Sequence, residues 1–290
     1  AIVSTPLVPS LALLVAIAIY PNFGASQTST GSLAQMSVQP VGHDGGFELV
    51  FRDEFDKPML NLDRWTTCFW WDDNGCTNLA SNELEWYMPS NVHIEDGALI
   101  LTARRESAIG FEGREFPYTS GIVTTGRYYA EDPGETRFEA TEGYFEMRVK
   151  LPSGQGLWPA FWMLPSSLHD KPEIDIMELL GHRPDMLELH FQYEDGAGNP
   201  SNIGRHLRTN DLTLDWDVFA AEWSSEQIVW YLDGVEMWRY TDQRYIPDVP
   251  MYLLINLAVG GDWPGDPDET TEFPATMKVD YVRAWVRREG

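Results

Sequence analysis

The chain has 290 residues, 43% of them hydrophobic, and a formal net charge of −25 at pH 7. This length can support one large all-β domain or two smaller domains. The acidic balance argues against nucleic acid, anionic membranes and sulfated polysaccharides as partners, because binding them requires clustered Lys and Arg. A neutral polymer carries no such penalty, and the 12 Trp residues favour stacking against sugar rings as well as core packing.

The first 46 residues have the pattern of an export signal followed by a linker. Residues 11–19 are apolar but too few to cross a bilayer as a helix, and small residues follow them. We therefore predict a signal-peptide-like segment at residues 1–26, a Ser-, Thr- and Gly-rich linker at 27–46 and a secreted protein. The remaining residues, 47–290, are expected to form the folded domain.

The chain has two cysteines, Cys68 and Cys76, on either side of a tight polar stretch. Two cysteines are too few for a structural zinc site. If the protein is exported, a local disulfide is expected, and if it is not, the two residues are free thiols.

Nearly everything after Gly46 is patterned as short strands separated by turn residues. Residues 143–151 alternate cleanly between two faces, and Asp233-Gly234 is a strong hairpin signal. No long stretch has helical period and no βαβ alternation is present. The clearest predicted strands are residues 47–51, 98–102, 143–151, 187–191, 227–232, 251–257 and 277–285. This pattern predicts an all-β fold, a jelly-roll sandwich of two antiparallel sheets with a concave cleft.

Residues 173–178 read Glu-Ile-Asp-Ile-Met-Glu and place three carboxylates in an apolar stretch. Strand alternation sends Glu173 and Asp175 to one face, and a β-bulge near Ile176-Met177 would bring Glu178 to the same face. The two glutamates would then lie roughly 13 Å apart at their Cα atoms, and their side chains could close to the ~5 Å of a retaining glycosidase. The alternatives are a solvated acidic face and a calcium site.

Residues on both sides of this strand admit two interpretations each. Trp158 and Trp162 are either core residues or a stacking platform beside the acidic strand. His190, in the next predicted strand, is either structural or part of the site. Asn82 and Glu85 either line a groove or belong to a polar loop.

Several stretches, taken together and in order, resemble glycoside hydrolase family 16, and in particular its laminarinase-type endo-1,3-β-glucanases. The acidic strand in its bulged form carries the resemblance, together with Leu157-Trp-Pro-Ala-Phe-Trp-Met-Leu-Pro165. The other matching stretches are residues 51–55, 81–87, 118–121, 230–234, 254–265 and 279–283. The resemblance covers residues 47 to about 287.

This resemblance implies a role for each acidic residue of the strand. Glu173 would be the nucleophile, Glu178 the general acid and base, and Asp175 the partner that hydrogen-bonds the nucleophile. No cofactor is expected for the chemistry. The positions that match sugar-contacting residues are Trp158, Trp162, His190, Asn82 and Glu85.

The resemblance also implies a structural calcium ion on the convex side. Its ligands would be the backbone carbonyls of Glu48 and Gly97 and the side chain of Asp280, and oxygen ligands of this kind suit calcium.

One position departs from the family pattern. Many laminarinases have an Arg where this chain has Ile122, so a sugar-contacting cation is missing unless Arg127 or Arg114 replaces it.

The sequence thus favours a secreted, monomeric, endo-acting and retaining β-glucanase that hydrolyses internal 1,3-β-linkages of a neutral polysaccharide. The alternatives on the same fold are a mixed-linkage glucanase, a hydrolase of galactan or agarose, and a transglycosylase. A non-catalytic glucan-binding module is a further alternative, but such relatives tend to lose the carboxylates that this chain retains.

Overall fold

The structure is a computed structural model, and the part of it that can be described covers residues 38–69, 76–127, 136–167 and 170–288. The predicted signal-like segment and the start of the predicted linker lie outside these residues. The described residues belong to one compact unit that begins at Ser37.

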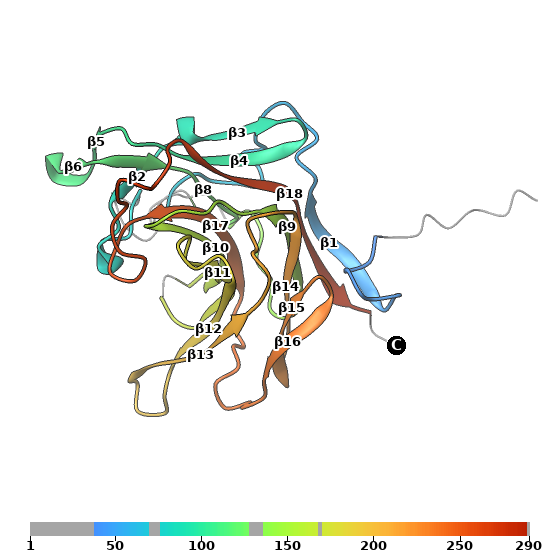
Figure 1. Cartoon of the computed structure of the whole chain (residues 1–290). Helices are drawn as coiled ribbons and strands as arrows, with labels where there is room; N and C mark the ends of the chain where they lie inside the picture. Colours follow the sequence, from blue (N-terminus) through green and yellow to red (C-terminus); the bar gives the residue numbers. More distant parts are fainter. Residues whose placement is uncertain (1–37, 70–75, 128–135, 168–169, 289–290) are drawn as a thin grey trace, which may run out of the picture. The chain divides into compact units, whose positions relative to one another are not determined.

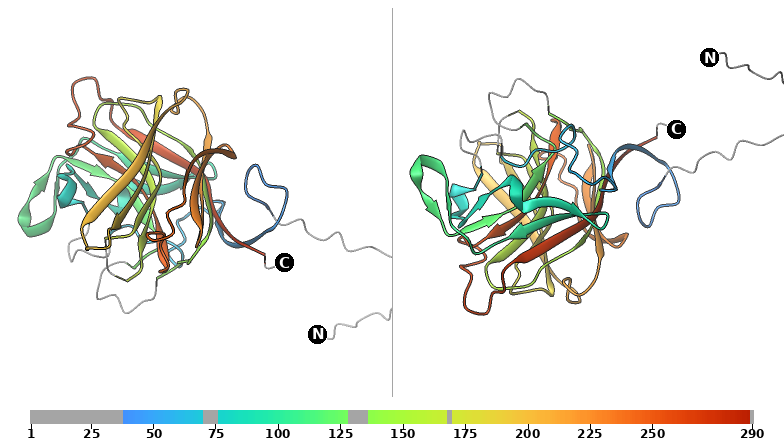
Figure 2. Two further views of the ribbon diagram at one scale, coloured as in Figure 1. Left: turned by 90° about the horizontal axis from the view of Figure 1, so that it is seen from below. Right: turned by 90° about the horizontal axis from the view of Figure 1, so that it is seen from above.

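Two large antiparallel sheets form this unit, and they face each other as a sandwich (Figures 1 and 2). The eight-stranded sheet has the order β16 (Val235–Tyr240), β15 (Gln227–Leu232), β14 (Asp217–Ser224), β9 (Gly143–Lys150), β18 (Ala275–Arg287), β4 (Ala98–Ala103) and β3 (Val92–Glu95), with β1 (Phe47–Asp53) also paired to β18. The six-stranded sheet has the order β13 (Pro200–Arg208), β12 (Met186–Glu194), β11 (Glu173–Leu179), β10 (Leu157–Pro165), β17 (Met251–Val259) and β8 (Ile122–Thr124).

Smaller elements lie at one end of the sandwich (Figure 1). Strand β2 (Glu85–Tyr87) pairs in parallel with β7 (Tyr118–Ser120), and β5 (Ala108–Ile109) pairs with β6 (Glu115–Phe116). The described residues contain no α-helix, only the short 3₁₀ segments Leu79–Ser81, Pro89–Asn91 and Phe111–Gly113. The predicted all-β jelly roll is confirmed by the strands and by its likeness to solved structures, reported below.

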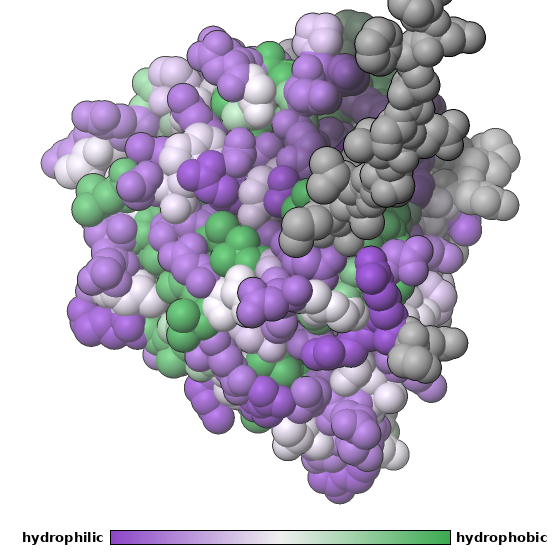
Figure 3. Space-filling view, turned by 90° about the vertical axis from the view of Figure 1, so that its right-hand side faces the viewer, coloured by the Kyte–Doolittle hydropathy of each residue, from purple (hydrophilic) through white to green (hydrophobic). Residues whose placement is uncertain are grey.

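The core lies between the two sheets and follows from the alternation in the sequence. In β9, Phe145, Met147 and Val149 are fully buried against the other sheet. Each such side chain contributes roughly 1.5–3 kcal/mol relative to an exposed one. Polar side chains dominate the face seen in Figure 3, and apolar ones are scattered over it.

Residues 38–46, predicted as the end of the linker, instead pack on the eight-stranded sheet. The backbone N–H of Val41 donates to Glu146 Oε2 at 2.8 Å, and the His43 ring lies edge-on to Tyr144 at 5.1 Å. Trp285 Nε1 donates to the carbonyl of Val38 at 2.8 Å. The packed domain therefore begins several residues before Phe47.

No helix among these described residues has the length and apolar character needed to cross a membrane.

Candidate active site

A β-bulge in β11 brings its acidic residues onto one face. Asp175 pairs with His190 and Glu178 pairs with Glu188, so three steps along β11 correspond to two along β12. The predicted bulge at Ile176 is therefore present. It turns Glu178 to the same side as Glu173 and Asp175 while the apolar residues between them stay buried.

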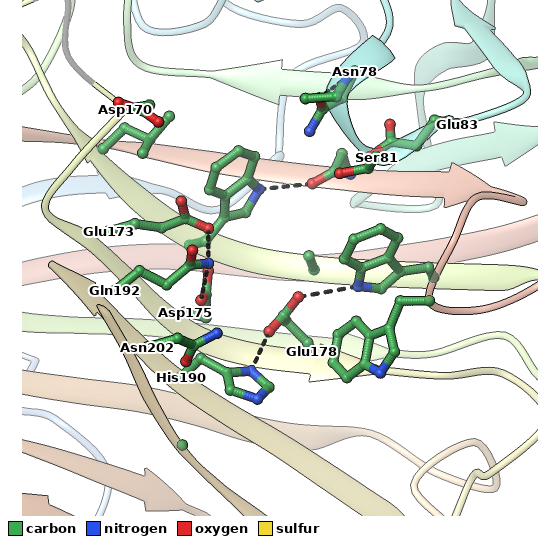
Figure 4. Close-up of a pocket in the computed structure, with 18 of the residues that line it drawn as sticks. Asn78, Ser81, Glu83, Asp170, Glu173, Asp175, Glu178, His190, Gln192 and Asn202 are labelled. Carbon is green, nitrogen blue, oxygen red and sulfur yellow. Dashed lines mark hydrogen bonds and ion pairs between the residues drawn. The ribbon is translucent and has the colours of Figure 1, made fainter. Parts of the chain in front are cut away.

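These acids stand on the floor of a cleft of about 910 Å³ over the six-stranded sheet (Figure 4). Its size is within the range of small-molecule and cofactor sites. Its other lining residues come from β10, β12, β13, β17 and the connections β1–β2, β10–β11 and β17–β18: Phe69, Asn78, Ala80, Ser81, Glu83, Trp158, Ala160, Trp162, Leu164, Asp170, Lys171, His190, Gln192, Asn202, Gly204, His206, Asn256 and Trp263.

Two neighbours hold the Glu178 carboxylate, one on each oxygen. Trp158 Nε1 donates to Oε1 at 3.1 Å, and His190 Nδ1 lies 2.7 Å from Oε2 (Figure 4). Burial lowers the pKa of His190, but the Glu178 hydrogen bond, with the charges of Glu178, Glu188 and Glu173, outweighs this effect and raises it. Glu178 therefore sits beside a ring whose protonated form its own charge and hydrogen bond favour.

Glu173 has a different set of partners. Lys171 Nζ donates to Oε2 at 3.0 Å, and Gln192 Nε2 donates to Oε1 at 2.7 Å. Burial raises the pKa of Glu173, whereas the Lys171 ammonium and a hydrogen bond from Asp175 oppose that rise. Lys171 is the only Lys or Arg among the described residues that line the cleft.

Asp175 lies between the two glutamates and is 2% exposed. Burial, followed by the negative charges of Glu173 and Glu178, raises the pKa of Asp175 well above its ordinary value. This rise favours the protonated form of Asp175, which donates a hydrogen bond to Glu173. The neutral acid stabilises its neighbour as an ionised carboxylate.

A chain of hydrogen bonds fixes Trp162 on the same face. Trp162 Nε1 donates to Asn256 Oδ1 at 2.8 Å, and Asn256 Nδ2 donates to the Tyr87 hydroxyl oxygen at 3.0 Å. The Tyr87 hydroxyl in turn contacts Glu83 at 3.5 Å. Burial raises the pKa of Glu83 to about 7.

Comparison with known proteins agrees with this geometry. The sequence pattern of glycosyl hydrolases family 16 matches residues 80–283.

The chain belongs to glycosyl hydrolases family 16.

Individual family 16 proteins are similar over most of the chain. A β-glucanase of Rhodothermus marinus is 36% identical, over 82% of this chain and 85% of the relative. The catalytic domain of an endo-1,3-β-glucanase (laminarinase) from Thermotoga petrophila has a TM-score of 0.72 at 32% identity, covering 84% of this chain and 99% of that domain. The endo-1,3-1,4-β-glycanase EglC of Rhizobium meliloti is 34% identical over 81% of this chain, which spans only 51% of EglC.

The cleft brings together six of the residues that the sequence singled out. They are Glu173, Asp175, Glu178, Trp158, Trp162 and His190. The Trp158 and Trp162 rings are held by the hydrogen bonds described above, so they are part of the cleft face and not of the core between the sheets.

Two residues that the family 16 resemblance placed in the groove lie elsewhere. Glu85 is 0% exposed, and its carboxylate accepts from the backbone N–H of Val259 at 2.7 Å. Asn82, in a left-handed conformation, directs its amide to Asp262 at 3.0 Å. Glu83, from the loop before β2, lines the cleft in place of Glu85. Neither Asn82 nor Glu85 lines the cleft in this structure.

The predicted calcium ligands of family 16 do not converge. Glu48 pairs with Val286 on β18, six residues from Asp280, which is about 20 Å along a strand. The Asp280 carboxylate already pairs with Arg148 Nη1 at 2.7 Å. Gly97 lies in the turn between β3 and β4, near the Asp280 end of β18. The three-ligand site is therefore wrong as a set, because Glu48 lies at the far end of the sheet.

Ile122, where many laminarinases have Arg, is fully buried. It packs with Phe69, Tyr87 and Leu254 on the cleft side of the six-stranded sheet. Neither Arg127 nor Arg114, the two expected replacements, lines the cleft. Apolar side chains thus surround this position, and one of them, Phe69, is next to Cys68 of the Cys68–Cys76 disulfide.

Four cleft residues with roles at the site were missed by the sequence analysis. Gln192 bridges Glu173 and Asp175 at 2.7 and 3.4 Å, and the strand parity that places it beside His190 was the available signal. Trp263, in a loop after β17, sets its ring edge-on to Trp158 at 5.4 Å. The role of His206 depends on the pairing of β13 with β12, and that of Lys171 on how the chain enters β11.

Proposed function

We propose that this protein is a secreted, endo-acting and retaining β-glucanase that hydrolyses internal 1,3-β-glucosidic linkages of laminarin-like polysaccharides. The observation that carries the proposal is the bulged strand β11, which presents Glu173 and Glu178 on one cleft face with different partners. Paired carboxyl groups with distinct environments are the machinery of glycoside hydrolysis.

In the first step, Glu173 attacks the anomeric carbon and Glu178 donates a proton to the departing glycosidic oxygen. The attacking carboxylate must be ionised. Lys171 at 3.0 Å and the neutral Asp175 both favour that form. The products of this step are a glycosyl ester on Glu173 and the released half of the polymer.

In the second step, water attacks the anomeric carbon of the ester, and Glu178 accepts the proton of that water. Trp158 Nε1 and His190 Nδ1 keep the Glu178 carboxylate in one orientation through both steps. Two inversions at the same carbon give net retention. Only carboxylates take part, so this chemistry uses no cofactor.

The substrate class follows from the cleft and from the relatives. Trp158, Trp162 and Trp263 offer indole surfaces for sugar rings, and neutral sugars suit a strongly acidic protein. The similar Thermotoga petrophila domain is described as a laminarinase. We propose that the protein acts on this neutral glucan as a monomer.

A mixed-linkage glucan is the second candidate substrate. EglC, which is 34% identical, is described as an endo-1,3-1,4-β-glycanase, and Ile122 removes the arginine typical of laminarinases.

Secretion is supported by the Cys68–Cys76 disulfide, since such bonds persist mainly outside reducing compartments. The apolar segment at residues 11–19 supports it as well.

Product analysis on laminarin and lichenan, with Glu173→Gln as the control, tests the proposal. We expect oligosaccharides from laminarin with the wild type and none with the variant. NMR of the first-formed product should show the β-anomer. Cleavage of lichenan alone would favour the second candidate. An α-anomer, or no product from either glucan, would overturn the proposal.

A further inference from the structure

A second group of titratable side chains lies next to the catalytic strand, and of its members only His190 has a part in the proposed chemistry. Glu188 and His190 stand on β12, and His206 stands opposite Glu188 on β13. One ligand atom from each of the three lies within 4.8 Å of the others. We call these three residues the Glu188–His206 cluster.

Glu188 supplies an unsatisfied buried charge in this cluster. Its side chain is 1% exposed, and Oε2 contacts His206 Nδ1. Its Oε1 is buried and has no hydrogen-bond partner. Arg183 Nη1 is 3.9 Å away, which is beyond hydrogen-bonding distance. A buried carboxylate oxygen in this state is stabilised by a cation that reaches it directly.

His190 is oriented as a metal-ligating histidine is. Its Nδ1 lies 2.7 Å from the Glu178 carboxylate, which leaves Nε2 for a ligand. Histidines that bind metals commonly donate their second ring N–H to a carboxylate in this way. Gly204 faces the ring, and a Cβ at that position would lie 2.8 Å from Nε2. The glycine therefore leaves Nε2 uncovered.

We propose that the Glu188–His206 cluster binds a divalent transition metal ion, Zn²⁺ in the first instance, through Glu188, His190 Nε2 and His206. Two imidazoles and one carboxylate, with a water as the fourth ligand, are a zinc-type set, whereas Ca²⁺ and Mg²⁺ prefer oxygen ligands alone. The strongly negative chain raises the local concentration of cations at its surface.

Metal binding would inhibit the enzyme reversibly, a consequence that rests on the proposed function. A metal on Nε2 keeps His190 neutral with its proton on Nδ1. Because His190 and His206 line the cleft and His190 Nδ1 contacts Glu178, the bound ion would lie in the cleft beside the proposed acid and base. An ion there would occupy space that the polysaccharide needs at the cleavage point.

A second arrangement of ligands competes with this one. Asp175, Glu178 and His190 also offer atoms within 4.8 Å of one another. We favour the Glu188–His206 cluster because it contains the buried oxygen without a hydrogen-bond partner.

Calorimetric titration of the full chain with ZnCl₂, after dialysis against a chelator, tests the site without reference to activity. We expect one saturable site that Glu188→Gln and His206→Gln each weaken by about tenfold or more. Arg183→Gln should tighten binding several-fold, because it removes a positive charge 3.9 Å from a ligand. Asp175→Asn should leave the affinity unchanged. Co²⁺ in place of Zn²⁺ should give the absorption of a four-coordinate ion.

Inhibition of laminarin hydrolysis should have a midpoint equal to the measured Zn²⁺ affinity and should be relieved by chelator. Absence of saturable binding would overturn the site, and so would binding that Glu188→Gln and His206→Gln leave intact. Binding lost in Asp175→Asn alone would assign the ion to the competing set and likewise overturn it. An enzyme inactive on every glucan would overturn the proposed function and leave the binding result standing.

Discussion

Each of the two sheets carries buried carboxylates on its outer face, and the two groups differ in how their oxygens are satisfied. On the eight-stranded sheet, Glu146 Oε1 accepts from the Tyr281 hydroxyl at 2.8 Å, and Oε2 accepts from Val41 N–H at 2.8 Å. Glu222 accepts from Arg287 Nε at 2.6 Å and from the Tyr231 hydroxyl at 3.3 Å. Each carboxylate oxygen there has its own donor.

On the six-stranded sheet, three acids share fewer donors. Gln192 serves both Glu173 and Asp175. The charge of Glu178 raises the pKa of Glu173, and the charges of Glu173 and Glu178 raise that of Asp175. The comparison teaches that burial alone does not mark an active carboxylate. Unlike Glu146, the acids of the cleft are left with competing charges, and such groups change protonation state easily.

Replacing the proposed nucleophile should have the largest effect. Glu173→Gln keeps the shape and the Gln192 contact but removes the attacking charge, so kcat/KM on the cleaved glucan should fall at least ~10³-fold. The thermal midpoint should stay close to that of the wild type. Retained turnover would contradict the assignment of Glu173, and a collapsed midpoint would place Glu173 among the structural acids.

The corresponding change on the other sheet should act on stability and not on turnover. Glu146→Gln turns an accepting oxygen into an N–H₂ group facing a donor, Val41 N–H or the Tyr281 hydroxyl. Unfolding in urea should show a loss of about 1–3 kcal/mol. Turnover per folded molecule should be unchanged. If turnover dropped with stability intact, the distinction between the two sheets would fail.

Replacing Lys171, the cation that lines the cleft, with a neutral residue should shift the acidic limb of the pH profile of kcat/KM. Lys171 holds down the pKa of Glu173, so Lys171→Gln should raise that pKa and move the limb to higher pH. A shift of one unit gives about a tenfold loss on the acidic side. In Lys171→Arg the acidic limb should lie at the wild-type pH again. Arg148→Gln, which breaks an ion pair on the other sheet, should leave the limb where it is in the wild type. An unmoved limb in Lys171→Gln would show that Lys171 does not control Glu173.

The smallest expected effect is on the way the free energy of unfolding depends on pH. Asp175 has a raised pKa in the folded chain, so the folded state holds a proton that the unfolded state loses. Stability from this group is therefore present at acidic pH and falls as pH rises from the ordinary Asp value toward the folded one. Asp175→Asn should flatten the slope by up to about 1.4 kcal/mol per pH unit. Urea unfolding between pH 4 and 8 measures it, and an identical slope would show that Asp175 is ionised when folded.

Much of the catalytic strand could be predicted because its information is local. Alternation within β11 and the parity of Glu178 were enough to require a bulge, and the fold class followed from strand spacing. Partners reached across strands could not be predicted in this way. Lys171 is only two residues from Glu173, yet its contact depends on how the chain enters β11.

Two assignments that the family resemblance implied differ from the structure. Glu85 begins β2 and is buried, and Glu83, in the loop before it, lines the cleft. The calcium set requires Glu48 and Asp280 to be neighbours, which depends on the register of β1 against β18. The register between two strands that are far apart in sequence cannot be deduced from the sequence of either strand alone.

Gly204 shows that a residue without a side chain can restrict which substitutions the chain tolerates. A Cβ there would meet His190 Cδ2 at 2.2 Å, so any other residue pushes the ring that orients Glu178. Substitutions at position 204 should therefore be tolerated less well than those at exposed positions of the edge strand β13, although Gly204 has no side chain to make a contact of its own.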